Sequence, residues 1–232
     1  MGKKIFIVGT GTDVGKTYIT GLILKKLKEN GISAAYYKAA MSGNQRRQDG
    51  SLIPGDGVFV KNMSGIGQSL EEMCPYVYEA AVSPHLAAQL EGTSVSLEGV
   101  KEGFASVLEK YDYVAMEGSG GILCPIRMEK EEIWLEDIIK SLGLSCILVA
   151  DAGLGVINNV GLTAAYLKMR NISLKGIIFN HYLPGSIMQE DNIRMCESLT
   201  GTKVIACVKD GDENLNLSLD ALCGLFEEGK KL

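Results

Sequence analysis

Near its N-terminus the chain reads Ile5-Phe6-Ile7-Val8 and then Gly9-Thr10-Gly11-Thr12-Asp13-Val14-Gly15-Lys16-Thr17. An apolar strand pattern leads into this loop, and a helical pattern leads out of it. A strand, a glycine-rich loop, Gly-Lys-Thr and a helix in this order are typical of a phosphate-binding site. Glycines let the backbone turn so that successive N–H groups face phosphate oxygens, and the helix N-terminus adds a positive dipole end. The stretch therefore predicts a nucleotide site rather than an ordinary strand-to-helix turn.

The loop is one residue longer than the usual pattern. That pattern has glycine five positions before Gly15, where this chain has Thr10, and Gly9 lies one position further back. The Lys16 ammonium is expected to reach the terminal phosphates, and the Thr17 hydroxyl to bind Mg²⁺.

The composition is that of an ordinary globular protein. Of the 232 residues, 46% are hydrophobic and 22% are charged, with a formal net charge of −5. This balance argues against the basic surface of a nucleic-acid-binding protein, so anion binding should be local to the loop. No apolar run approaches the ~18 residues of a membrane span. Scattered cysteines without a C-x-x-C pair indicate reduced thiols. We expect a soluble cytoplasmic protein.

Apolar strand patterns alternate with amphipathic helix patterns along the chain. This alternation indicates βαβ units, a mostly parallel sheet and helices on both faces. No linker or repeat divides the sequence, so we predict one α/β domain over residues 1–232. Strands are expected at about 4–9, 33–38, 113–116, 145–150, 174–179 and 203–208. Helices are expected at about 15–29, 58–63, 83–91, 96–110, 135–142, 158–170, 187–199 and 218–228, and a long polar loop at 42–57.

Polar residues stand at the carboxyl ends of several predicted strands. Lys38 ends the second strand, Glu117 the third and Asn180 the fifth, and Ser42 follows Lys38 shortly. Ligands of open parallel sheets bind outside these strand ends, so we expect these side chains to gather beside the phosphate loop. Lys38 would then be a second cation beside Lys16, which suits phosphoryl transfer because that reaction depends on charge neutralisation.

Two carboxylates are candidates for a metal site. Glu117 begins the turn Glu117-Gly118-Ser119-Gly120-Gly121, where a nucleoside triphosphatase needs an acid for Mg²⁺. Asp56 lies between two glycines, a setting in which aspartate is more usually a turn residue. Asp112 starts the third strand at the opposite edge and is expected to be a turn residue. His181 follows Asn180, but the sequence does not favour a place for it near the nucleotide base.

Together these residues resemble the dethiobiotin synthetase family. The lengthened loop matches that family's own variant of the phosphate loop. Tyr37-Lys38-…-Ser42-Gly43 is similar to its Tyr-Lys-Pro-x-x-Ser-Gly segment, with Ala39 in place of the frequent Pro. Ser83-Pro84-His85, the turn at 117–121 and Leu154-Gly155-Val156-Ile157-Asn158 also recur in the family.

The resemblance implies a phosphate-loop NTPase fold and an ATP-dependent cyclo-ligase of biotin biosynthesis. In that family, 7,8-diaminononanoate takes up CO₂ (or bicarbonate) as a carbamate. ATP phosphorylates the carbamate to a carbamic–phosphoric anhydride. The second amine then closes the ureido ring of dethiobiotin, and ADP and phosphate are released.

The resemblance also implies roles for individual residues. Lys16 and Lys38 would be catalytic, and Mg²⁺ would be held by Thr17, Asp56 and Glu117. The nucleotide contacts would come from Asp13, Val14, Gly15, Lys16, Thr17, Tyr18, Asp56, Glu117, Gly118, Ser119, Gly120 and Asn180. The substrate contacts would come from Thr12, Lys38, Ser42, Gly155, Val156, Ile157 and Asn158. In the family the helix end at 155–158 belongs to the neighbouring subunit, which implies a homodimer.

The nearest alternative keeps the fold and changes the function. A partner-switching ATPase of the deviant phosphate-loop class has a signature lysine five residues before the loop lysine, where this chain has Gly11. Amidating synthetases of corrinoid pathways carry a glutaminase domain, for which 232 residues leave no room. A regulatory nucleotide-binding module would not need two lysines and two carboxylates.

Overall fold

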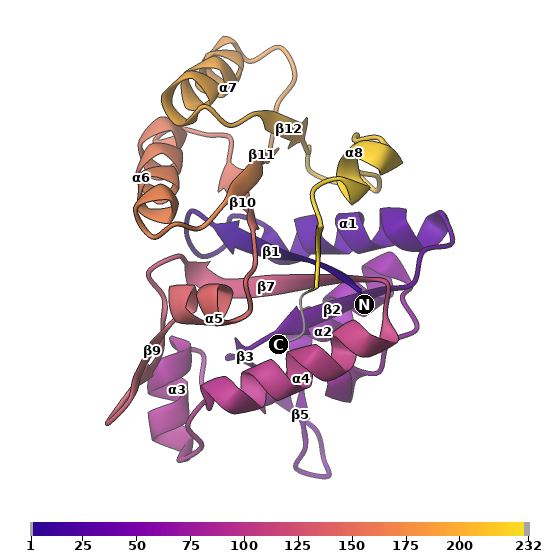
Figure 1. Ribbon diagram of the computed structural model, residues 1–232, viewed down its shortest axis with the longest axis vertical. Coiled ribbons are helices and arrows are strands. Elements are labelled where there is room, and N and C mark those ends of the chain that lie inside the picture. The colour runs from indigo at the N-terminus through magenta and orange to yellow at the C-terminus, as the bar shows by residue number, and fades with distance from the viewer. Residues whose placement is uncertain (1, 230–232) are drawn as a thin grey trace.

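A seven-stranded sheet forms the centre of the computed structural model, which describes residues 2–229 (Figure 1). The ends of the predicted 1–232 domain, residues 1 and 230–232, lie outside this range. The strand order is β12-β11-β10-β1-β7-β2, and β13 pairs with β1. All pairs on this path are parallel, and β13 is antiparallel to β1. The bounds are β1 Lys3–Gly9, β2 Ala34–Lys38, β7 Tyr113–Gly121, β10 Cys146–Asp151, β11 Leu174–Asn180, β12 Val204–Cys207 and β13 Glu227–Glu228.

Helices cover both faces of the sheet, which confirms the predicted α/β architecture. One face carries α1 Lys16–Glu29, α2 Gly55–Ser64 and α8 Leu219–Cys223. The other carries α3 Pro84–Glu91, α4 Leu97–Lys110, α5 Leu135–Ser141, α6 Val156–Met169 and α7 Ile187–Thr200.

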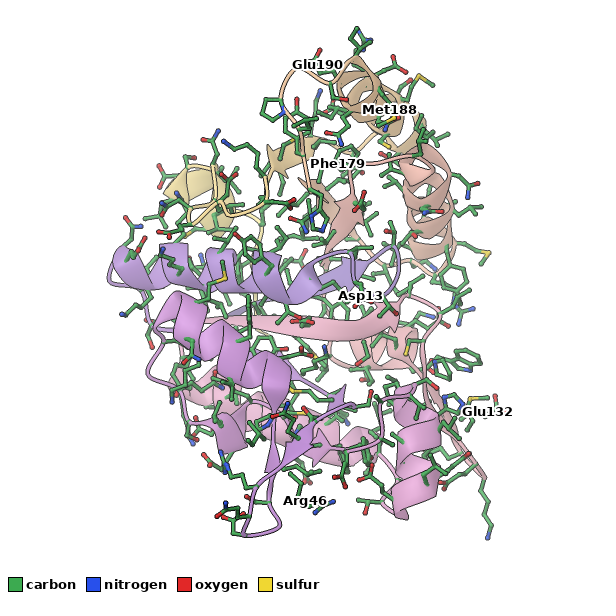
Figure 2. The ribbon with its side chains drawn as sticks, turned by 180° about the vertical axis from the view of Figure 1, so that it is seen from behind. Asp13, Arg46, Glu132, Phe179, Met188 and Glu190 are labelled. Atoms are coloured by element: carbon green, nitrogen blue, oxygen red, sulfur yellow. The ribbon has the colours of Figure 1, made fainter. Side chains whose placement is uncertain are left out.

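Short strands and a 3₁₀ helix lie between the strands and helices of this central structure. The predicted polar loop at 42–57 contains a hairpin of β4 Gln45–Arg46 and β5 Leu52–Ile53. Figure 2 places Arg46 of this hairpin at one end of the molecule, far from Asp13 of the phosphate loop. A second hairpin joins β8 Pro125–Met128 to β9 Glu132–Trp134, and β3 Ala40–Met41 pairs with β6 Tyr76–Val77. A short 3₁₀ helix spans Leu70–Glu72.

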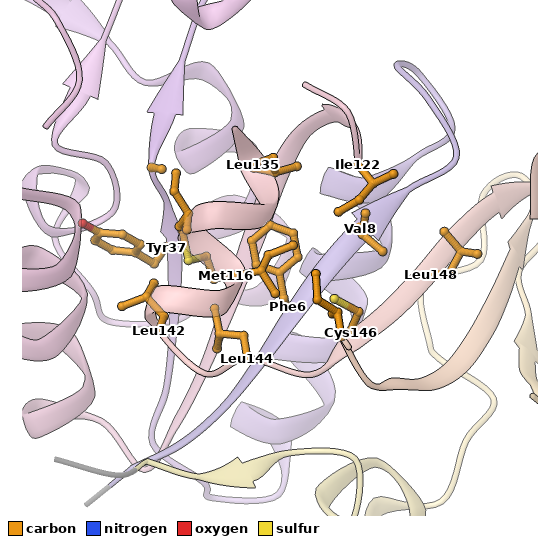
Figure 3. Close-up of a cluster of buried hydrophobic side chains, with 14 of the residues drawn as sticks. Phe6, Val8, Tyr37, Met116, Ile122, Leu135, Leu142, Leu144, Cys146 and Leu148 are labelled. Carbon is orange, nitrogen blue, oxygen red and sulfur yellow. The ribbon is translucent and has the colours of Figure 1, made fainter. Parts of the chain in front are cut away.

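The protein has two hydrophobic cores, one on each face of the sheet. They form because successive side chains of a strand point to opposite faces. Along β1, Ile5 and Ile7 face the core under α1, whereas Phe6 and Val8 face the opposite core. Figure 3 shows Phe6 and Val8 packed with Met116 of β7 in that second core. Because both faces are buried, the strand is a continuous apolar run, as expected for a central parallel strand.

Several element boundaries differ from the sequence predictions, and α2 begins at Gly55, inside the loop predicted at 42–57. The last helix was expected at 218–228 but ends at Cys223, and β13 follows. Phe226 is buried there, with its ring 5.0 Å from that of Tyr113 and edge-on to it, so tertiary burial outweighs local helical preference. The third strand was expected to end near Met116 but continues to Gly121, which pairs with Gly9.

The helices of residues 2–229 are all too short or too polar to cross a membrane.

Candidate active site

The phosphate loop is shaped by a left-handed glycine at the start of α1. Gly15 has φ 92°, a conformation that favours glycine. A Cβ atom on Gly15 would lie 2.1 Å from Nδ2 of Asn180, which is the last residue of β11. The same Nδ2 donates a hydrogen bond to the carbonyl oxygen of Val14 at 3.3 Å. The loop and the fifth predicted strand therefore meet in contact, as their positions at the strand ends suggested.

A cavity of about 770 Å³ opens beside this loop at the carboxyl ends of the strands. Its volume lies within the range usual for small-molecule sites. It is lined by residues from the phosphate loop, β2, α2, β7, β11 and the segment after β12: Thr12, Asp13, Gly15, Lys16, Thr17, Tyr18, Lys38, Ala40, Ser42, Gly55, Asp56, Phe59, Glu117, Ser119, Gly120, Asn180, His181, Lys209, Asp210 and Gly211.

A charged cluster lies on one wall of the cavity. Lys38 donates to Oδ2 of Asp56 at 2.7 Å and to Oε1 of Glu117 at 2.9 Å. The Thr17 hydroxyl donates to the same Oε1 of Glu117, also at 2.9 Å. Residues from α1, β2, α2 and β7 thus converge on one point, as parallel strands and their following loops allow.

The two lysines have opposite pKa shifts. Burial lowers the pKa of Lys16, the nearby Lys38 lowers it further, and Glu117 only partly offsets these effects. The Lys16 ammonium donates to the carbonyl oxygen of Gly11 at 2.7 Å. Burial alone would also lower the pKa of Lys38, but the carboxylates of Glu117 and Asp56 outweigh it and raise that pKa. Lys38 is therefore the more firmly charged of the two.

Tyr36 is a member of this cluster that the sequence analysis missed. Its hydroxyl donates to Oε2 of Glu117 at 3.0 Å. Burial first, and the Glu117 charge second, raise the pKa of Tyr36 well above its usual value. The sequence could have revealed Tyr36, because residues two apart on a strand point to the same face and Lys38 lies two positions after Tyr36.

The donor set fits Mg²⁺. Residues 2–229 hold no cluster of three or more histidine, cysteine, aspartate or glutamate side chains suited to a metal ion. However, Asp56 and Glu117 both contact the Lys38 ammonium, so their carboxylates face one point, and the Thr17 hydroxyl is beside them. Mg²⁺ takes oxygen ligands and is usually held by one or two carboxylates together with phosphates and water. Thr17, Asp56 and Glu117 have this chemistry.

Comparison with known proteins identifies the family. The family model described as an AAA domain matches residues 3–213. The ATP-dependent dethiobiotin synthetase BioD of Clostridium botulinum (strain Loch Maree / Type A3) is 46% identical over 98% of this chain and 100% of its own. The enzyme of the same name from Brachyspira hyodysenteriae is 44% identical over 91% of this chain and 94% of its own. The chain belongs to the dethiobiotin synthetase family.

Solved structures outside the dethiobiotin synthetase family share the fold. The MinC:MinD cell division protein complex of Aquifex aeolicus matches with a TM-score of 0.54 at 14% identity, covering 95% of this chain and 85% of that one. Chloroplast FtsY from Physcomitrella patens matches with a TM-score of 0.53 at 17% identity, covering 96% and 65%. At these identities the likeness concerns the fold alone, which is the fold implied by the family resemblance.

Most of the site residues predicted from the dethiobiotin synthetase motifs line the cavity, but Val14, Gly118 and the four residues 155–158 do not. The Val14 side chain packs in the core under α1, and its carbonyl oxygen is engaged by Asn180. A Cβ atom on Gly118 would lie 2.9 Å from Phe6 and 3.0 Å from Leu135, so this position faces the opposite core. Alternation along β7 explains the second case, because Glu117 and Ser119 face the cavity and Gly118 lies between them.

Gly155, Val156, Ile157 and Asn158 lie at the N-terminus of α6, outside this cavity. Val156 is buried, and Gly155 and Asn158 are exposed. The structure therefore does not bring these four residues to the cavity of the same chain.

The sequence analysis assigned no residue of the segment after β12 to the site. Lys209, Asp210 and Gly211 line the cavity together with His181, whose Nδ1 lies 2.5 Å from Oδ1 of Asp210. The Tyr18 hydroxyl donates to the carbonyl oxygen of Asp212 at 2.5 Å, which connects this segment to α1. The position of the segment, at the carboxyl end of a parallel strand, was the signal that could have found it.

Proposed function

We propose that this protein is an ATP-dependent dethiobiotin synthetase, a ligase that forms carbon–nitrogen bonds in biotin biosynthesis. Two buried lysines, two carboxylates and a phosphate loop lining one cavity are the observation that carries this proposal. No observation favours the partner-switching ATPase, because Gly11 stands where that class has its lysine and the MinD likeness extends to the fold alone.

The reaction has three steps. One amine of 7,8-diaminononanoate attacks CO₂, forms a C–N bond and loses a proton, which leaves a carbamate. A carbamate oxygen attacks the γ-phosphorus of ATP, the bond to the bridging oxygen breaks, and ADP leaves. The second amine attacks the carbonyl carbon of the resulting anhydride and loses a proton, and phosphate leaves with the electrons of the broken C–O bond.

The chain's own residues act mainly through charge and position. Lys16 would leave the Gly11 carbonyl and bind the terminal phosphates. Lys38 would stabilise the negative charge shared by the carbamate and the transferred phosphoryl group. Thr12 and Ser42 line the cavity and would contact the carbamate region. Such preorganised charge is commonly the largest contribution to phosphoryl transfer.

Mg²⁺ would be held by Thr17, Asp56 and Glu117. When bound, it supplies positive charge to the phosphate oxygens of ATP. Asp56 and Glu117 are bridged by Lys38, so Lys38 and the ion would share one carboxylate pair.

The nucleotide site would extend from the phosphate loop to Asn180. Tyr18, Ser119 and Gly120 line the same cavity and would contact the nucleotide. Asn180 would read an edge of the base. Since ATP is a cytoplasmic substrate, we place the enzyme in the cytoplasm.

A homodimer would complete the substrate site. The N-terminus of α6 presents the exposed Gly155 and Asn158, and its dipole suits the carboxylate of 7,8-diaminononanoate. Leu162 and Met169 on this helix are exposed, as is Leu154 just before it. Covering such apolar side chains favours association. Residues 155–158 of one subunit would then reach the cavity of the partner.

Incubation with 7,8-diaminononanoate, bicarbonate, Mg²⁺ and ATP tests the proposal. The expected result is ADP release that depends on the diamine, with a cyclic urea product seen by mass spectrometry. Omitting the diamine is the control for uncoupled hydrolysis. If neither diamine-dependent ADP nor the cyclic urea forms, the protein is not a dethiobiotin synthetase.

A further inference from the structure

We propose that Tyr36 is a positioning residue, whose buried hydroxyl holds Oε2 of Glu117 so that Oε1 faces Thr17 and Lys38. This inference rests on the metal-binding part of the proposed function, in which Glu117 is a ligand of Mg²⁺.

The negative charge of Glu117 is buried and is stabilised by three hydrogen-bond donors. Its side chain is 1% exposed. Thr17 and Lys38 both donate to Oε1, and Tyr36 donates to Oε2 at 3.0 Å. A buried carboxylate oxygen that loses its donor is costly, so without Tyr36 the carboxylate is expected to rotate towards its remaining donors. Rotation would turn Oε1 away from the point that it shares with Asp56.

The backbone of Tyr36 is itself held in place. β2 is the last strand on its side of the sheet, so Tyr36 has β7 on one side only. On the other side the fully buried Gln68 accepts from the Tyr36 N–H at 2.8 Å and donates to its carbonyl oxygen at 3.0 Å. The Gln68 amide thereby replaces a neighbouring strand. Lys61 in turn donates to the backbone carbonyl oxygen of Gln68 at 2.7 Å. This support suits a residue whose hydroxyl must be placed accurately.

The next residue provides a matched control. Tyr37 points to the opposite face of the sheet, where Figure 3 shows it in the core with Met116. It is also buried, its hydroxyl donates to the carbonyl oxygen of Val100 at 3.0 Å, and its ring lies 5.4 Å from that of Phe104. Tyr36→Phe and Tyr37→Phe each remove one buried hydroxyl, but only the first removes a donor to Glu117.

The test measures the affinity of Mn²⁺ for the ADP complex by electron paramagnetic resonance, with Mn²⁺ as a probe for Mg²⁺. Removing a group that orients a metal ligand typically weakens metal binding by 10- to 100-fold. We expect Tyr36→Phe to bind Mn²⁺ about tenfold more weakly and Tyr37→Phe to stay within about twofold of the unsubstituted protein. ADP affinity in EDTA should be equal in all three proteins, and thermal unfolding should show a similar loss of stability in both variants.

A purely structural role for Tyr36 would lower the unfolding temperature of Tyr36→Phe and leave its Mn²⁺ affinity unchanged, which would overturn the proposal. Equal weakening in both variants would overturn it as well. The measurement needs neither the diamine nor ring closure, so a failure of the dethiobiotin synthetase assignment does not affect it. If the unsubstituted ADP complex binds no Mn²⁺, the metal site and this inference are both wrong.

Discussion

The N-termini of α1 and α6 have the same local structure in different surroundings. Each helix is 14 residues long, and each follows a left-handed glycine, with φ 92° at Gly15 and 86° at Gly155. A Cβ atom on Gly15 would collide with Asn180 at 2.1 Å. A Cβ atom on Gly155 would have no atom of residues 2–229 within 4 Å. One terminus is enclosed by other strands, and the other is open.

The difference in enclosure shows what turns a helix N-terminus into a ligand-binding site. At α1, the cavity beside the phosphate loop is also lined by Lys38 of β2, Glu117 of β7 and Asn180 of β11. At α6, the preceding Leu154 is 89% exposed. A helix dipole alone binds anions weakly in water, because its effect is screened. The α6 terminus would gain its enclosure from the partner subunit in the proposed homodimer.

The largest expected effect comes from removing the positive charge that Lys38 of β2 places in the cavity beside the N-terminus of α1. Lys38→Ala should lower kcat for ring closure by about 10²- to 10³-fold, the usual result of deleting a group that stabilises transition-state charge. Lys101→Ala removes a surface lysine paired with Glu98 and is the control, with kcat unchanged. Near-native turnover of folded Lys38→Ala would remove Lys38 from the catalytic machinery.

Alanine at the two glycines compares the termini directly. Both substitutions place a side chain at positive φ, which costs about 1–2 kcal/mol. Gly15→Ala also collides with Asn180, so ADP affinity should fall by more than about tenfold. Gly155→Ala should lower the free energy of unfolding by a similar amount, because the backbone strain is the same, and should leave ADP affinity unchanged. Calorimetric titration with ADP, combined with urea unfolding, separates the two effects. Equal ADP affinities in both variants would show that enclosure does not distinguish the termini.

A charge on the exposed face of α6 tests whether a second copy encloses that terminus. Leu162→Glu should yield monomers in analytical ultracentrifugation and raise the KM for the diamine by about tenfold, because the carboxylate contact is lost. ADP affinity should not change. Leu90→Glu on α3 is the matched control, since Leu90 is 66% exposed and Leu162 is 65% exposed. Monomeric unsubstituted protein with full activity would contradict the shared site.

The smallest effect concerns pH at the enclosed terminus. Because the pKa of Lys16 is lowered from 10.5, ADP affinity should decline on the alkaline side before pH 10.5. As the pH rises, the Lys16 ammonium loses its proton in the folded protein before it does in the unfolded chain. Between its lowered pKa and pH 10.5, titration of Lys16 therefore makes the free energy of unfolding rise with pH. Lys38 has a raised pKa, and the stability from its charge is lost only above 10.5. Lys16→Arg should remove the decline in affinity, because arginine stays charged. An alkaline decline that persists in Lys16→Arg has another cause.

The sequence predicted more of the site than of the minor elements. Lys38, Glu117 and Asn180 were placed at predicted strand ends and all line the cavity, although β7 itself continues past Glu117 to Gly121. Parallel strands bring their carboxyl ends to one edge whatever their separation in sequence. The hairpin at 45–53 and the strand β13 were missed, since short strands carry little local signal and depend on pairing partners. Tyr36 and the segment after β12 belong to none of the motifs used, so only their positions, on the face of Lys38 and after a parallel strand, pointed to the cavity.

The sequence by itself determined the α/β architecture, the phosphate loop and the family. These depend on local patterns, namely hydrophobic periodicity and a glycine-rich loop whose conformation is set by its own residues. Only the tertiary structure decided which side of β2 serves the site, how Tyr36 and Gln68 support Glu117, and why Gly15 and Gly155 differ. Those properties depend on contacts between residues far apart in the chain, such as Gly15 with Asn180, and no local pattern encodes them.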